Sequence, residues 1–89
     1  MRAIHFGSSL GGGVEETAER ARYLEELGYE SVSSGEHVMR GTPPGPSNMV
    51  LPTLAVAAGA TTSIRLLSAV LFLPLYHPVM VAKLAGTLD

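Results

Sequence analysis

The chain has no cysteine and no tryptophan, and few of its side chains are charged. The absence of cysteine from its 89 residues excludes disulfide bonds and thiolate metal sites, and it is typical of a cytoplasmic protein. Only 16% of the residues are charged, against roughly 25% in an ordinary soluble domain. We therefore expect part of the surface to be covered in the working protein.

Basic clusters and long apolar runs are also missing. The six lysines and arginines are scattered and the net charge is -2, which argues against nucleic-acid binding. The most apolar run, residues 66–76, is far shorter than the roughly 20 residues of a membrane span. Residues 1–6 lack the apolar stretch of a signal peptide. These absences predict a cytoplasmic protein that binds neither nucleic acid nor membrane.

The first third of the chain has the pattern of a strand followed by a helix. Residues 3–6 form a short mixed run that predicts a strand, and the turn-rich "GSSLGGG" ends it. Apolar residues spaced by three or four predict a helix over residues 14–27, with acidic residues in its first turn. Gly28 stands where a left-handed C-cap is expected.

The strand-helix pattern then repeats twice. Residues 30–34 predict a second strand, and residues 35–47 form a proline- and glycine-rich loop too long for a simple turn. An alanine-rich helix is expected over residues 49–61. Residues 64–73 are almost continuously apolar, which is typical of a parallel strand buried on both faces. A third helix is expected over residues 78–89.

This alternation predicts an α/β fold with parallel strands in one sheet. Three such units neither close a barrel nor cover both faces of a sheet. A complete TIM (β/α)8 barrel needs about 250 residues. We therefore interpret the chain as the first three βα units of such a barrel, a single amino-terminal fragment over residues 1–89.

The candidate site lies where the second strand ends, because ligands of parallel α/β proteins bind at the carboxyl ends of the strands. Glu36 and His37 follow that strand directly. Histidine exchanges protons near neutral pH, so His37 is the candidate catalytic residue; the alternative is a loop histidine that caps or packs on backbone. Glu36 is expected to orient a neighbouring loop or to pair with an arginine rather than to share the reaction.

Two other kinds of site are weaker. The glycines at 11–13 precede a helix and could cradle a phosphate, but they match no phosphate-binding motif, so a hinge is the preferred interpretation. His5 is expected to pack in the core, and His77 to help start the third helix. The three histidines show no metal-ligand spacing, so we expect no metal site.

Two stretches carry a family resemblance. "EELGYESVSSGEHV" and "TLAVAAGATTSIRLLSAVLFLPLYHPVMVAKLAGTLD" resemble the amino-terminal part of the luciferase-like monooxygenases. The similarity extends from about residue 18 to residue 89. Its most specific elements are the acid-histidine pair after the second strand, "IRL" at the third strand, and "LPLYHP" beyond it.

The resemblance implies a TIM barrel that binds a reduced flavin at the carboxyl ends of its strands, either FMN or the deazaflavin coenzyme F-420. It implies that His37 contacts the cofactor, its intermediates and the substrate. It also implies a non-prolyl cis peptide between Ala69 and Val70, next to the ring of the cofactor. Ser68, Ala69, Val70 and Glu36 are the expected cofactor-binding residues.

The function expected from the resemblance is a flavin- or deazaflavin-dependent oxidoreductase or monooxygenase. It would act on a small organic substrate by hydride transfer or oxygen activation, and would need a carboxyl-terminal part to complete the barrel. The alternative is a non-catalytic barrel module that self-associates through its open edge. A homo-oligomer is expected in either case. Another TIM-barrel enzyme, such as a phosphate-sugar isomerase, is less favoured because none of its motifs is present.

Overall fold

A sheet of three parallel strands forms the centre of the molecule. In the computed structural model the strands are β1 (Gly7–Ser9), β2 (Ser31–Ser34) and β3 (Arg65–Ser68). They are hydrogen-bonded in the order β1, β2, β3. Val32 in the middle strand lies opposite Ser8 of β1 and Leu66 of β3. The structure describes residues 3–11, 13–45 and 47–89.

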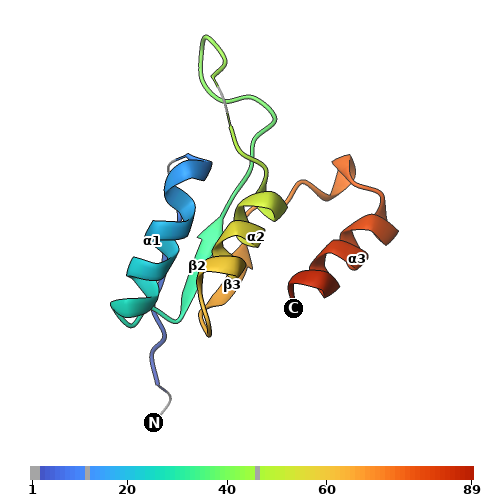
Figure 1. Ribbon diagram of the computed structural model, residues 1–89. Helices are drawn as coiled ribbons and strands as arrows, with labels where there is room; N and C mark the ends of the chain where they lie inside the picture. The colour runs from blue at the N-terminus through green and yellow to red at the C-terminus, as the bar shows by residue number, and fades with distance from the viewer. Residues whose placement is uncertain (1–2, 12, 46) are drawn as a thin grey trace.

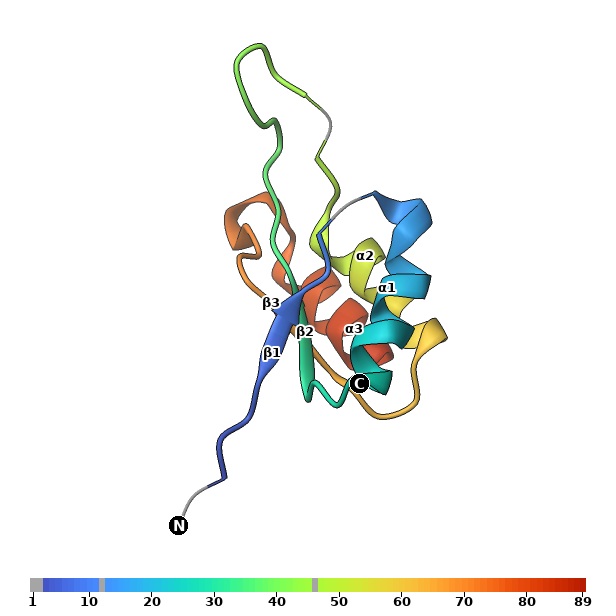
Figure 2. The ribbon, with the colours of Figure 1, turned by 90° about the vertical axis from the view of Figure 1, so that its left-hand side faces the viewer.

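Three α-helices lie on one side of this sheet. They are α1 (Val14–Glu26), α2 (Val50–Ala60) and α3 (Pro78–Leu88), and a short 3-10 helix, η1 (Leu73–Leu75), precedes α3. Figure 1 shows α2 between α1 and α3, and Figure 2 shows the helices together on one side of the strands. The predicted α/β arrangement with parallel strands is therefore confirmed.

The helix ends follow from local sequence chemistry. Gly28, just beyond α1, has a φ of 92°, a left-handed conformation that a residue with a side chain rarely adopts. His77 caps α3, because its Nδ1 accepts a hydrogen bond from the Val79 amide at 3.2 Å. Pro78 then occupies the first position of α3, where its missing N–H costs nothing. The predicted roles of Gly28 and His77 are confirmed.

The core lies between the sheet and helices α1 and α2. Its buried apolar residues come from both helices, from the middle strand and from Leu10, which follows β1. None of the residues of α3, all of which the structure describes, is buried; Leu88 only packs against the core from outside. The core residues are Leu10, Ala21, Leu24, Val32, Val50, Leu54 and Ala57.

The opposite face of the sheet is open, which corrects one prediction. Residues 64–73 are predicted to be buried on both faces, yet within β3 Leu66 packs against the core while Leu67 is 52% exposed. The helices cover one face only, so every second apolar side chain of β3 points away from them. The apolar run therefore marks a face that is left uncovered in this chain.

The first strand and His5 also differ from prediction. The strand covers Gly7–Ser9 rather than residues 3–6, because it pairs with Ser31–Ser33 of β2. The backbone partners supplied by β2 outweigh the turn preference of the Gly-Ser-Ser sequence. His5 lies before the strand, is exposed, and forms an ion pair with Glu30 instead of packing in the core.

The third strand is shorter than predicted. It ends at Ser68, opposite Ser34, because β2 itself ends there and offers no further strand partner. Beyond this point separate hydrogen bonds connect the two chain segments, such as that from the amide of Glu36 to the carbonyl of Val70. The apolar run then continues into the turn that carries η1, so hydrophobicity alone does not show where the strand ends.

Candidate functional site

The segments that follow β2 and β3 approach each other closely at Gly35. A Cβ atom on this residue would lie 2.5 Å from the carbonyl oxygen of Ala69 and 3.0 Å from the amide nitrogen of Val70. Both atoms belong to the backbone, so only glycine fits. Sequence analysis did not single out Gly35; its place directly after a strand and before Glu36 was the available signal.

The backbone around Ala69 and Val70 is held by hydrogen bonds on both sides. The amide of Ala69 donates to the carbonyl of Ser34 at 2.8 Å, and the amide of Glu36 donates to the carbonyl of Val70 at 3.1 Å. The peptide bond between Ala69 and Val70 is cis, as the resemblance implies. Ala69 and Val70 are both exposed on the surface next to Gly35.

Glu36 is buried and connects three parts of the chain. Its side chain is 2% exposed, and its carboxylate accepts hydrogen bonds from the amide of Val50, which begins α2, and the amide of Phe72, both at 2.9 Å. The hydroxyl of Tyr76 lies 2.9 and 2.8 Å from its two oxygens. The prediction that Glu36 orients a neighbouring loop is confirmed. Among the described residues its donors are amides and a tyrosine rather than an arginine.

These donors keep the Glu36 carboxylate charged. Burial alone would raise the pKa of Glu36, but the hydrogen bonds from Val50, Phe72 and Tyr76 outweigh it, and its pKa lies below the ordinary value. The Tyr76 hydroxyl responds in the opposite direction. Burial, the hydrogen bond to Glu36 and the carboxylate charge raise the pKa of Tyr76 to about 12. The pair therefore stays as carboxylate and neutral phenol across the physiological range.

His37, the next residue, lies at the surface. Its ring meets that of Phe72 edge to face, with the ring centroids 6.2 Å apart and the planes at 72°. His37 lines a cavity of about 500 Å³ at the carboxyl ends of β1 and β2. Ser9, Ser34 and Arg40 line the same cavity, so its walls carry hydroxyl groups and one guanidinium. This arrangement suits a polar ligand that exchanges a proton with an imidazole.

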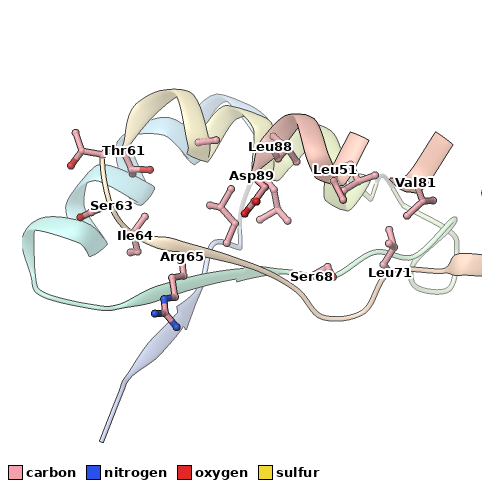
Figure 3. A pocket seen from close by; sticks show the side chains of 15 residues that line it. Leu51, Thr61, Ser63, Ile64, Arg65, Ser68, Leu71, Val81, Leu88 and Asp89 are labelled. Carbon is pink, nitrogen blue, oxygen red and sulfur yellow. The ribbon is translucent and has the colours of Figure 1, made fainter. Parts of the chain in front are cut away.

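The structure brings together four of the five predicted site residues. Glu36, His37, Ala69 and Val70 lie at the ends of β2 and β3. Ser68, the last residue of β3, directly precedes Ala69 but lines a separate cavity of about 650 Å³ between α2, α3 and β3. Figure 3 shows Ser68 among the side chains that line this second cavity, which are both apolar and polar. Ser68 alternates with its neighbour along the strand and so faces the helices.

The described part of the chain offers neither a cluster of metal ligands nor a membrane-spanning helix. Among residues 3–11, 13–45 and 47–89, no group of three or more histidine, cysteine, aspartate or glutamate side chains could hold a metal ion. Within the same ranges, no helix is long and apolar enough to cross a membrane.

Of the glycines at 11–13, Gly13 is the N-cap residue of α1, and Gly12 lies outside the described residues.

The chain is an α/β protein with a cavity at the carboxyl end of its parallel sheet, where a histidine, a buried glutamate and small residues follow the strands. The chain belongs to the luciferase-like monooxygenase family, because the model of that family matches residues 3–89. The resemblance stated from the sequence is therefore confirmed.

One curated relative supports this assignment. The chain is 41% identical over 71 residues to the 4-hydroxyprotoasukamycin monooxygenase of Streptomyces nodosus subsp. asukaensis. The matched segment covers 80% of this chain but 19% of that protein, so the chain spans about a fifth of the length of its relative. No solved structure gave a significant match.

Proposed function

We propose that this chain forms the amino-terminal part of a monooxygenase that uses FMN or the deazaflavin coenzyme F-420. Membership of the luciferase-like family and the monooxygenase relative support an enzyme of this type. Members of the family generally use flavin-type cofactors. In this proposal the three βα units are the first part of a (β/α)8 barrel whose remaining strands pair beyond β3.

The observation that carries the proposal is the place of His37 next to a surface of very small residues. Gly35 has no side chain and Ala69 has only a methyl group; both are exposed, they contact each other, and Gly35 lines the same cavity as His37. These residues fit a planar ring, because a ring can approach the backbone where no long side chain stands in the way. Val70 borders the same surface, so Gly35, Ala69 and Val70 would hold one face of the cofactor.

In this proposal some residues of the chain bind the ligands and His37 transfers a proton. A bound flavin would supply the redox chemistry of the site. His37 would hold or move a proton at the reacting atoms, since an imidazole nitrogen can donate or accept one. Arg40 and the serine hydroxyls of the cavity would orient a small organic substrate. Glu36 is enclosed by its donors, so its direct contact with a cofactor, implied by the resemblance, stays a prediction.

The test is the substitution His37→Ala in the full-length protein. Turnover should fall by about 100-fold or more, the usual contribution of a positioned acid or base. His5→Ala is the matched control, because His5 is an exposed histidine outside the site, and it should leave turnover unchanged. Unchanged turnover in H37A would remove the assigned role. Flavin affinity, followed by fluorescence, should persist in both variants.

A second candidate function is self-association without catalysis. It is favoured by the apolar residues exposed on α3, among them Val79 at 68% and Met80 at 55%. Sedimentation of the full-length protein with flavin present separates the two candidates. Flavin that co-sediments with the protein supports the enzyme, and an assembly with no affinity for flavin supports the self-associating module.

A further inference from the structure

Glu36 holds the surroundings of His37 in place through two of its groups, the backbone amide and the side-chain carboxylate. Along the chain, Glu36 immediately precedes His37, and its own amide is fixed to the carbonyl of Val70. Across the fold, its carboxylate holds the amide of Phe72, the residue whose ring meets the imidazole. One buried residue therefore anchors, through its amide, the backbone that leads into His37 and, through its carboxylate, the segment that carries the Phe72 ring.

Tyr76 completes this anchor from the other side. Its hydroxyl lies within hydrogen-bond distance of both Glu36 oxygens, and it follows Phe72 by four residues, just beyond η1. A carboxylate that is almost fully buried depends on every donor it has, because a lost donor is not replaced by water. Loss of the Tyr76 hydroxyl should therefore let the carboxylate, and the segment that includes Phe72, move.

We propose that Glu36 and Tyr76 form a positioning pair that sets the location of the His37 imidazole relative to Phe72 and the Gly35–Ala69 surface. In this proposal the pair takes no direct part in the reaction. It acts through His37, and the inference therefore rests on the proposed function of that residue. Nothing in the sequence pattern links residues 36 and 76; only the fold brings them into contact.

The test is Tyr76→Phe, which removes one oxygen and keeps the aromatic ring. In the cofactor-free full-length protein, the imidazole proton resonances of His37 should shift, because the ring of Phe72 changes position. H37A identifies these resonances by their loss. Tyr23→Phe is the matched control, since Tyr23 is a tyrosine exposed on α1, and it should leave the His37 resonances in place.

Kinetics supply the second measurement. A small misplacement of a catalytic group lowers rates steeply, so kcat of Y76F should fall about tenfold with KM little changed. In the H37A background the same substitution should have no further effect, because the pair acts through His37. Additive losses in the double variant would overturn the proposal, as would unshifted His37 resonances together with wild-type kcat in Y76F.

The two proposals fail in different ways. If H37A keeps its turnover, the role of His37 is wrong whatever Y76F shows. If H37A loses turnover while Y76F keeps both its kcat and its His37 resonances, the role of His37 stands and the positioning pair is overturned. A Y76F protein that is merely less stable, with unshifted resonances at a temperature where it is folded, also counts against the pair.

Discussion

Two glutamates tie loops together at opposite ends of the sheet, and they differ in burial. Glu25, at the end of α1, accepts hydrogen bonds from the amides of Ser63 and Ile64 at 2.9 and 2.8 Å, in the loop that enters β3. Glu36 accepts from the amides of Val50 and Phe72, beyond the carboxyl ends of the strands. Glu25 stays accessible to solvent, whereas Glu36 is 2% exposed.

The difference in burial changes how each carboxylate depends on its donors. Both carboxylates have a lowered pKa: for Glu25 the main cause is the amide of Ser63, then that of Ile64, while for Glu36 the donors must first overcome burial. Water can replace a lost donor at Glu25 but not at Glu36. In α/β barrels the amino-terminal end of the strands serves stability and the carboxyl-terminal end holds the site. Glu25 and Glu36 follow that division.

The largest expected effect comes from Glu36→Gln. The amide group of glutamine replaces one acceptor oxygen with a donor, which then faces another donor inside the protein. We expect the free energy of unfolding to fall by about 3 kcal/mol. Glu25→Gln makes the same chemical change at a position that water can reach, and it should lower the free energy of unfolding by clearly less. Urea denaturation measures both, and equal losses would contradict the comparison.

A second, smaller effect is expected from Gly35→Ala. The new methyl would meet the backbone of Ala69 at 2.5 Å, and the two segments must separate to make room. Overpacking of this kind costs about 2 kcal/mol. Gly59→Ala is the matched control, because no atom lies within 4 Å of its Cβ position in α2. There the helix should gain about 0.5–1 kcal/mol. An unchanged free energy of unfolding in G35A would show that the two backbone segments can separate at no cost.

The smallest effect is in the dependence of stability on pH. The folded protein holds Glu36 in its charged form more strongly than the unfolded chain, in which a glutamate has a pKa of about 4.3. Its contribution is therefore complete above that pH and is lost as the pH falls through the lower folded pKa. Urea midpoints measured between pH 3 and pH 7 should fall less steeply in E36Q than in the wild type. If the urea midpoints of E36Q and the wild type change in parallel with pH, Glu36 does not contribute to the pH dependence of stability.

The sequence predicted the helices better than the strands. Helix periodicity and the caps Gly28 and His77 are local signals, so the predicted helices match the observed ones to within one or two residues. Strand β1 was misplaced because its pairing depends on β2, which lies 22 residues further along the chain. His5 was assigned to the core for the same reason, since its environment follows from where the strand begins.

For the site, sequence reasoning found His37 and the Ala69–Val70 peptide but not how they are held. His37 and Glu36 could be identified by their place after a strand, and the cis peptide by family resemblance. The contact of Tyr76 with Glu36 joins residues 40 apart, and the approach of Gly35 to Ala69 joins residues 34 apart. No local pattern encodes such contacts. The expected contact of Ser68 with a cofactor stays a prediction, and that Ser68 also lines the cavity beside α2 and α3 could not be judged from an apolar run.

By itself, the sequence determined the alternation of strands and helices, the helix caps, the family and the candidate histidine, because each of these depends on residues close together in the chain. Only the tertiary structure decided which face of the sheet is covered, where the strands begin and end, and which donors enclose Glu36. Those features depend on contacts between distant segments. Hydrogen bonds and burial assign each side chain its surroundings only once the segments have met.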